Sequence, residues 1–218
     1  MLVVVVASGA MSASDDRWLD RADLVIAADG GFSSLDALGR RPDRLVGDMD
    51  STHPGLVDRL EADGVPIERH PADKEATDTE LAVRAAIDAG ATQVVILGAL
   101  GGPRFDHELA NLLLLADTRL ADVDAWIVRG ATTVRFLADG GSLALAGEAG
   151  SLVSLLPIGG DVVGVTTAGL RWPLSGATLR FGASRGISNE IITSPASVSV
   201  ERGRLILIET ATEEGASS

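Results

Sequence analysis

Short apolar runs alternate with amphipathic stretches over the first 130 residues of this chain. The apolar runs, rich in Val, Leu, Ile and Ala, predict buried strands at residues 2–7, 24–28, 44–46, 66–69, 94–97 and 125–128. Between them, apolar periodicity and capping signals predict helices at residues 15–20, 33–38, 54–62, 77–89 and 106–116. This alternation favours an α/β domain whose parallel sheet is covered by helices on both faces.

The pattern changes after about residue 130. Helical periodicity stops, and β-prone runs separated by Gly, Pro, Ser or Asp predict strands at residues 132–137, 142–145, 152–157, 162–168, 177–179, 187–193, 197–201 and 204–209. Many short strands with frequent turn signals are typical of an all-β antiparallel sandwich or a partial barrel, and we favour the sandwich. The sequence therefore predicts an α/β domain over residues 1–130 and a β-sandwich domain over residues 131–210. The small polar residues 211–218 are expected to form a disordered tail.

Composition narrows the classes of partner. The formal net charge of −13 repels the backbone of nucleic acids, so no nucleic-acid partner is expected. A bound polyphosphate would need local positive charge or a metal ion in such a protein. The chain has no cysteine, which excludes disulfides and thiolate chemistry and fits a cytoplasmic location. The apolar run at residues 2–7 is too short to span a bilayer, and no membrane partner is expected.

An acidic motif follows the predicted strand at residues 44–46. Its carboxylates, Asp48 and Asp50, are two positions apart, so on an extended segment they would point to the same side with Cα atoms roughly 6.5–7 Å apart. Mg²⁺ prefers one or two carboxylates and leaves its other positions to phosphate and water. The spacing is typical of two ligands to one cation, although an Asp-rich turn has the same sequence.

A second motif precedes the predicted helix at residues 77–89. Thr77 is expected to cap this helix in a capping box with Glu80. Asp78 can stabilise the helix start and also face a site, because a helix that follows a strand begins at the ligand-binding edge of a parallel sheet. Lys74, the only lysine of the chain, is either a phosphate ligand or a solvated surface side chain.

A glycine-rich turn follows the predicted strand before residue 98. Gly98, Gly101 and Gly102 allow backbone N–H groups to approach a phosphate or a ribose. Arg104 is the only basic side chain beside the turn, and Asp106 is expected to cap the next helix. A packing hinge, a surface arginine and a capping aspartate are the alternatives. The turn is neither a Walker A loop nor a dinucleotide fingerprint.

The β-rich half contains one further signal. Trp172 stands beside a proline at the end of a predicted strand, in a chain with only 3% aromatic residues. It is either exposed and able to stack on a flat cationic ring, or buried in the sandwich core. Ser188 and Asn189 offer small polar groups to a heteroaromatic ligand, or form an ordinary turn.

Together these segments resemble the thiamine pyrophosphokinase family. The resemblance extends over nearly the whole chain, from about residue 2 to 208, and its segments come in the family's order. They are Asp29-Gly30-Gly31, Gly47-Asp48-Met49-Asp50-Ser51, Lys74 with Thr77-Asp78, Gly98-Ala99-Leu100-Gly101-Gly102 with Arg104-Phe105-Asp106-His107 and Asn111, and Gly169-Leu170-Arg171-Trp172 with Ser188-Asn189. The resemblance implies an ATP-binding α/β domain, a thiamine-binding sandwich, and a homodimer that holds thiamine between subunits. It also implies Mg²⁺-dependent transfer of a pyrophosphoryl group from ATP to the thiamine hydroxyl, with release of AMP.

The resemblance also implies roles for individual residues. Those implied to hold Mg²⁺ and its phosphates are Asp48, Asp50 and Asp78. Those implied to surround the reacting phosphates are Lys74, Arg104 and Asp106. Those implied to lie near the nucleotide are Asp29, Gly30, Gly98, Gly101, Gly102 and Asn111. Those implied to contact thiamine are Trp172, Ser188 and Asn189.

The chain departs from the family's pattern at two positions. Pro103 is an extra residue before Arg104, and Glu75 stands where Asp is usual after the lysine. The acceptor of the thiamine hydroxyl proton is left open between Asp78 and Asp106. Three alternatives are a pyrophosphokinase for another heterocyclic alcohol such as a pterin, a non-catalytic nucleotide or thiamine sensor, and a structural protein with capping aspartates throughout.

Overall fold

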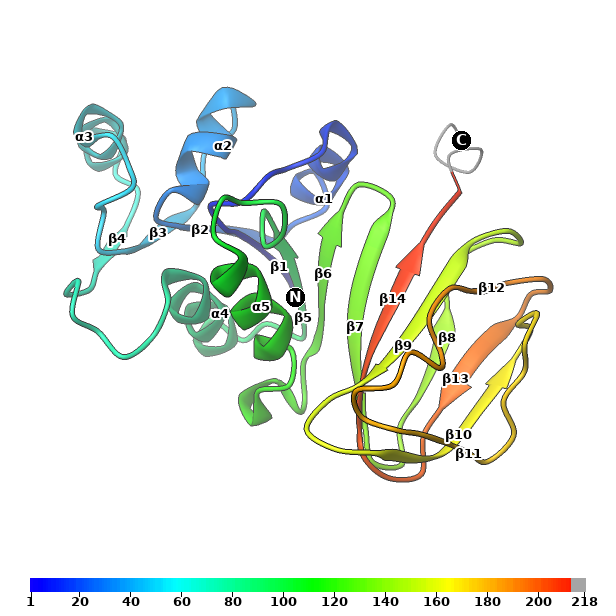
Figure 1. Ribbon diagram of the computed structural model, residues 1–218. Coiled ribbons are helices and arrows are strands. Elements are labelled where there is room, and N and C mark those ends of the chain that lie inside the picture. The colour runs from blue at the N-terminus through cyan, green and yellow to red at the C-terminus, as the bar shows by residue number, and fades with distance from the viewer. Residues whose placement is uncertain (213–218) are drawn as a thin grey trace. The chain divides into compact units, whose positions relative to one another are not determined.

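The computed structural model describes residues 1–212, which divide into two compact units (Figure 1). The first unit is Met1–Gly130, and the second begins at Ala131. The first is α/β and the second is all-β and antiparallel, so the predicted fold class is confirmed. Residues 213–218, which hold most of the predicted disordered tail, lie outside the described residues. Over residues 1–212, no helix has both the length and the apolar character needed to cross a bilayer.

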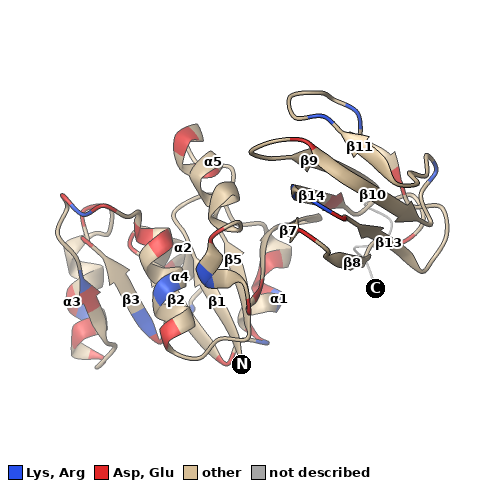
Figure 2. Ribbon diagram, turned by 90° about the horizontal axis from the view of Figure 1, so that it is seen from below, with Lys and Arg blue, Asp and Glu red and all other residues tan. Residues whose placement is uncertain are grey.

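The first unit is built on parallel strands in the order β6-β5-β1-β2-β3-β4. Their bounds are β1 Leu2–Val6, β2 Leu24–Ala28, β3 Arg44–Gly47, β4 Ile67–Arg69, β5 Gln93–Leu97 and β6 Asp124–Arg129. The central strands β1, β2 and β5 carry no charged residue, and Figure 2 shows them without red or blue. Because all the strands run the same way, their carboxyl ends lie along one edge of the sheet.

Helices cover both faces of this sheet (Figure 1). On one face lie α1 Asp16–Leu19, α2 Gly31–Ala37 and α3 Pro54–Ala62, and on the other lie α4 Asp78–Asp88 and α5 Phe105–Leu114. Two 3-10 turns, η1 Ala13–Asp15 and η2 Thr118–Leu120, complete the unit. Val4 and Val6 of β1 pack with Phe32 of α2 and Leu60 of α3 in one buried cluster.

The start of α4 follows the predicted capping signal in part. The Thr77 hydroxyl accepts a hydrogen bond of 3.2 Å from the backbone N–H of Glu80. The Glu80 side chain does not complete the predicted capping box, because its carboxylate forms ion pairs with Arg84 and Arg119 instead. The side-chain cap therefore anchors the helix start beside the ends of β1, β2 and β3, against which α4 packs.

The second unit is a sandwich of two antiparallel sheets, ordered β12-β9-β14-β7 and β11-β10-β13-β8. The strands are β7 Thr132–Ala138, β8 Ser142–Leu145, β9 Leu152–Pro157, β10 Val162–Ala168, β11 Ala177–Leu179, β12 Asn189–Glu190, β13 Ala196–Ser199 and β14 Arg204–Thr210. Alternate residues of both sheets, including Val153, Leu155, Val198 and Leu205, form one buried core.

One predicted strand is much shorter than expected. Residues 187–193 were expected to be extended, but β12 contains only Asn189 and Glu190. Ser188 has a positive φ of 57°, which ends the extended conformation on its amino-terminal side. The backbone N–H of Ile187 instead donates to Ser184 in a turn.

Candidate active site

The carboxyl edge of the parallel sheet contains a cleft of about 440 Å³. Its walls are the segments that follow β1, β2, β3, β4 and β5, together with the first turn of α4 and the first two turns of α5. The predicted residues that line it are Asp29, Asp48, Asp50, Lys74, Asp78, Gly98, Gly102, Arg104 and Asn111. Gly30, Gly101 and Asp106 belong to the same segments but do not line the cleft.

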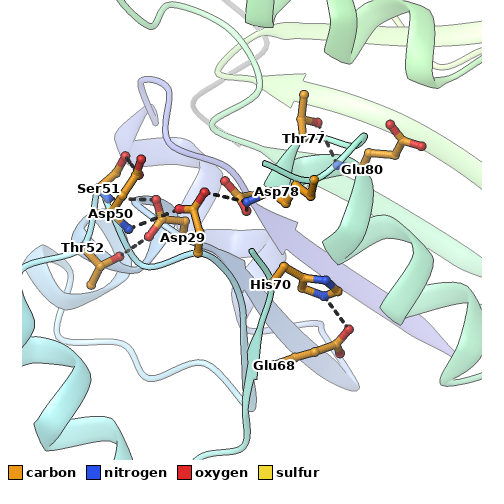
Figure 3. Close-up of polar contacts among 11 residues, drawn as sticks. Asp29, Asp50, Ser51, Thr52, Glu68, His70, Thr77, Asp78 and Glu80 are labelled. Atoms are coloured by element: carbon orange, nitrogen blue, oxygen red, sulfur yellow. Dashed lines mark hydrogen bonds and ion pairs between the residues drawn. The ribbon is translucent and has the colours of Figure 1, made fainter. Parts of the chain in front are cut away.

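Three carboxylates converge inside the cleft. One oxygen from each of Asp29, Asp48 and Asp78 lies within 4.8 Å of the others. Figure 3 shows the side chains of Asp29 and Asp78 pointing toward one another. They can approach because Gly47 lies between them: a Cβ on Gly47 would be 2.8 Å from Asp29 Cβ and 2.8 Å from Asp78 Oδ1. The glycine in the first acidic motif is therefore required by the close packing of two site aspartates.

Asp29 is held rigidly in this cluster. It is 2% exposed, and its oxygens accept hydrogen bonds from the Ser51 N–H at 3.1 Å and the Thr52 hydroxyl at 2.9 Å. Burial raises the pKa of Asp29 above its usual value, although these hydrogen bonds act in the opposite direction. Its φ of 38° lies in the left-handed region that non-glycine residues rarely adopt. Such strain is concentrated at functional sites in proteins.

Lys74 links the other two carboxylates. Its Nζ donates a hydrogen bond of 2.7 Å to Asp48 Oδ2 and lies 2.6 Å from Asp78 Oδ1. The hydrogen bond from Lys74 lowers the pKa of Asp48. Burial acts to lower the pKa of Lys74, but the two carboxylates outweigh it and the pKa is raised. The lysine is therefore an ordered, charged part of the cleft and not a solvated surface side chain.

These donors fit a divalent cation such as Mg²⁺. Carboxylate oxygens are the protein ligands that Mg²⁺ prefers, and three of them converge here. Asp78 Oδ1 is buried and lies 2.6 Å from the Lys74 ammonium. A buried carboxylate oxygen that already faces a positive charge is suited to serve as a ligand to a cation.

Asp50 differs from its predicted geometry. The expected extended segment is absent, since Met49 has a positive φ of 65° and the chain bends there. The Asp50 N–H donates to Asp48 Oδ1 at 3.2 Å, and the Asp50 carboxylate accepts from the Ser51 hydroxyl at 2.8 Å. Asp50 lines the cleft but lies outside the converging set, in which Asp29 stands with Asp48 and Asp78.

The glycine-rich loop after β5 has its carbonyl groups occupied by protein donors. The carbonyls of residues 98, 99 and 100 accept from Gly9 N–H at 2.6 Å, Asn111 Nδ2 at 2.9 Å and Ala10 N–H at 3.1 Å. The N–H groups of residues 99–102 have no acceptor within residues 1–212. A loop with fixed carbonyls and unpaired N–H groups can bind an anion such as a phosphate.

Sequence reasoning missed the segment that packs against this loop. Ser8 and Gly9 follow β1 and line the cleft. A Cβ on Gly9 would be 2.4 Å from the Gly98 carbonyl oxygen, so the two loops meet backbone to backbone. The signal that could have identified this segment is the pair of small residues Ser8-Gly9, which follows the apolar run at residues 2–7. His107 and Glu108 of α5 also line the cleft.

Arg104 reaches the cleft although Pro103 precedes it, and both residues line the wall. Its guanidinium forms two hydrogen bonds with the Asp106 carboxylate, at 2.9 Å and 2.6 Å, in an exposed pair. The Arg104 hydrogen bonds lower the pKa of Asp106 to about 2. The prediction of Asp106 as the helix cap is wrong, because α5 begins at Phe105 and Arg104 takes the N-cap position without a side-chain bond.

The predicted thiamine-binding residues of the second unit lie together. Trp172 is 57% exposed, which excludes the core alternative. Asn189 is buried: its Nδ2 donates to the Trp172 carbonyl at 2.8 Å, and its Oδ1 accepts from the Trp172 N–H at 3.1 Å. Ser188, whose N–H donates to Ser154 Oγ at 3.1 Å, is the third non-glycine residue with a positive φ. The amide of Asn189 therefore fixes the backbone that presents the indole.

Comparison with known proteins identifies the family. The model of the thiamin pyrophosphokinase catalytic domain matches residues 16–127, more than half of the chain. The chain belongs to the thiamine pyrophosphokinase family. The vitamin B1 binding domain of the same family matches residues 143–205. The predicted family is thus confirmed, and the pterin alternative is not favoured.

Relatives within this family match over most of their length. Thiamine pyrophosphokinase from Bacillus subtilis (strain 168) is 28% identical over 88% of this chain and 90% of its own. Thiamine pyrophosphokinase 1 from Arabidopsis thaliana is 33% identical over 78% of this chain and 72% of its own. The crystal structure of the Bacillus subtilis thiamine pyrophosphokinase superposes with a TM-score of 0.86, at 25% identity, over 97% of this chain and 99% of that one.

Proposed function

We propose that this chain transfers the pyrophosphoryl group of ATP to the hydroxyl of thiamine, giving thiamine diphosphate and AMP. The observation that carries the proposal is the cleft in which Asp29, Asp48, Asp78 and Lys74 converge beside a loop of unpaired N–H groups. Family membership across both units supports the same reaction. A cytoplasmic location stays a prediction.

The reaction forms one bond and breaks another at phosphorus. The thiamine hydroxyl oxygen attacks the β-phosphorus of ATP, and the bond from that phosphorus to the oxygen bridging to the α-phosphate breaks. The bridging oxygen leaves with AMP and carries the electron pair. The hydroxyl proton passes to a carboxylate. Most of the rate enhancement in such transfers comes from positioning and electrostatics.

We propose that Asp48 and Asp78 hold Mg²⁺ and that Asp29 is the third carboxylate of the site. Asp50, on the same loop as Asp48, is a further carboxylate that could approach the cation. When bound, Mg²⁺ would offset the charge of the polyphosphate and polarise the phosphoryl oxygens. Lys74 keeps Asp48 and Asp78 in place through its two contacts and offers its ammonium to a phosphate oxygen. Asp29 accepts hydrogen bonds from Ser51 and Thr52 and so ties the loop after β3 to the end of β2.

The loop at residues 98–102 is proposed to bind phosphate through its backbone. Asn111 donates a hydrogen bond to the Ala99 carbonyl, so we assign it the role of orienting the loop. Arg104 is proposed to stabilise the charge that develops on the AMP leaving group. In the Arg104–Asp106 pair, a carboxylate whose pKa is about 2 is a weak base. This favours Asp78 over Asp106 as the proton acceptor.

Thiamine is proposed to bind the second unit through Trp172 and Ser188, with Asn189 in a supporting role. The exposed indole of Trp172 offers a flat face to the cationic thiazolium ring. The Asn189 amide is occupied by the Trp172 backbone, so we assign Asn189 the orientation of that indole rather than direct contact with the ring.

We also propose a homodimer with thiamine held between subunits. Phe105, Leu109 and Leu113 form an exposed apolar stripe on α5, with Phe105 75% exposed. The second unit exposes further large apolar side chains, namely Leu152, Trp172, Phe181, Ile187 and Ile192. An exposed apolar stripe such as the one on α5 is typical of protein–protein contacts.

The test is AMP and thiamine diphosphate formation by the purified protein with ATP and Mg²⁺, with and without thiamine. Release of AMP that requires thiamine and matches thiamine diphosphate one to one is the expected result. ATP binding without AMP release in the presence of thiamine would overturn the proposed reaction.

A further inference from the structure

Arg129 stands at the carboxyl end of β6, the strand that pairs with β5. Because the two strands are parallel, Arg129 lies at the same sheet edge as the glycine-rich loop that follows β5. The carboxyl edge of an open parallel sheet is where α/β proteins bind ligands. No part of the family resemblance singles out this residue.

The guanidinium of Arg129 packs directly on that loop. A Cβ on Gly101 would be 2.4 Å from Arg129 Cζ and 2.5 and 2.7 Å from its two terminal nitrogens. Only glycine allows this approach, and the φ of 77° at Gly101 favours glycine independently. The arginine side chain is thus seated against the segment whose N–H groups lack acceptors.

The backbone beneath Arg129 is anchored. The next residue, Gly130, donates its N–H to Asp15 Oδ1 at 2.8 Å, and Asp15 Oδ2 accepts from the Ser12 N–H at 2.7 Å. Asp15 is fully buried. Both oxygens of the Asp15 carboxylate accept backbone hydrogen bonds, and these bonds fix the end of β6. The backbone position of Arg129 is therefore well defined.

The positive charge of Arg129 is not neutralised by any carboxylate among the described residues. Lys74 and Arg104, the basic side chains that line the cleft, are already paired with carboxylates. Within residues 1–212, Arg129 has neither an ion pair nor a hydrogen bond from its side chain. In a chain of net charge −13, an unpaired guanidinium beside an anion-binding loop is a ready partner for phosphate.

We infer that Arg129 is a further binding residue for the phosphate chain of the nucleoside triphosphate, which it contacts from the far side of Gly101. This inference rests on the proposed function and adds to it a residue outside the cleft wall. The guanidinium adds a positive charge that no carboxylate of the described residues neutralises, and the unpaired N–H groups of the loop supply the other half of the same phosphate site.

The test compares Arg129→Met with Arg41→Met by calorimetric titration of ATP, AMP and adenosine. Arg41 is the matched control, because it is exposed, has no recorded partner among the described residues, and lies before β3 at the opposite edge of the sheet. Loss of a hydrogen bond to a charged group is expected to raise the Kd for ATP about tenfold to a hundredfold. The Kd for adenosine and the thermal stability should stay as in the wild type, and Arg129→Lys should restore part of the ATP affinity.

An unchanged Kd for ATP in Arg129→Met would overturn the inference, as would equal losses for ATP and adenosine, which would indicate a distorted loop. A Gly101→Ala variant gives a second measure: the ATP affinity it loses should shrink when Arg129 is already Met. If the wild type itself fails to bind ATP, the proposed function fails. If the wild type binds ATP and both arginine variants have the same Kd for ATP as the wild type, the inferred role of Arg129 is wrong while the proposed function stands.

Discussion

Gly47→Ala is expected to disable the carboxylate cluster by adding one methyl group. The new Cβ would lie 2.8 Å from both Asp29 Cβ and Asp78 Oδ1, and 3.1 Å from Asp78 Cγ. Asp29 is held by hydrogen bonds from Ser51 and Thr52, so it has little room to retreat. The clash is therefore relieved mainly by displacing Asp78 away from Asp48 and Lys74.

The expected cost has two parts. Gly47 has a φ of 149°, and holding alanine in such a sparsely populated region costs about 1–3 kcal/mol. Overpacking a filled site costs about 1–3 kcal/mol more. The free energy of unfolding should fall by about 2–6 kcal/mol in total. A displacement of about 1 Å at the reacting groups can reduce the rate about a hundredfold, so kcat/KM should fall by that order.

Gly64→Ala is the matched control. Gly64 also has a positive φ, 75°, but nothing lies within 4 Å of its added Cβ. It should lose about 1–2 kcal/mol of stability and keep its kcat/KM. The assay is thiamine diphosphate formation at saturating ATP and Mg²⁺, at a temperature where urea titration shows both variants folded. Gly47→Ala with kcat/KM within threefold of the wild type would refute the reasoning, and an equal loss in Gly64→Ala would assign the effect to general destabilisation.

Three further predictions concern the cleft and the exposed indole of the second unit. Asp50→Asn should lower kcat, because Asp50 lines the cleft on the same loop as Asp48. It should change the free energy of unfolding by less than about 0.5 kcal/mol, because its side chain is exposed; turnover at the wild-type rate would remove Asp50 from the mechanism. Lys74→Met should raise the pKa of Asp48, followed by NMR titration, since two facing carboxylates repel by about 1–4 kcal/mol without a cation between them. The folded pKa of Asp48 lies below its unfolded value, so the wild type should hold the stability from this pair above about pH 4 and lose it as the pH falls through the folded pKa; superimposable acid-denaturation curves for wild type and Lys74→Met would contradict this. Trp172→Ala should raise the KM for thiamine more than the KM for ATP, and equal changes in both would contradict a stacking role for the indole.

Apolar periodicity and capping signals were sufficient to predict most of the secondary structure. The valine run of β1 and the Thr77 cap of α4 appear where the sequence indicates them, because both depend on near neighbours in the chain. The strand predicted at residues 187–193 is too long: its β-branched residues give a strand signal, whereas the left-handed backbone of Ser188 ends the extended conformation on the amino-terminal side of β12. A positive φ at a serine cannot be predicted reliably from the sequence, because serine rarely adopts it.

The sequence by itself determined which segments carry the chemistry: the acidic motifs, the lysine and the glycine-rich loop all stand at strand ends, and parallel strands bring such ends to one edge. Only the tertiary structure decided which side chains meet. The bend at Met49 turns Asp50 out of the converging set, and the space left by Gly47 admits Asp29 to it. Arg129 reaches Gly101 from 28 positions along the chain. Distances of a few ångströms between residues on different strands depend on sheet order, register and single backbone angles, and these are set by packing over the whole domain rather than by any local run of residues.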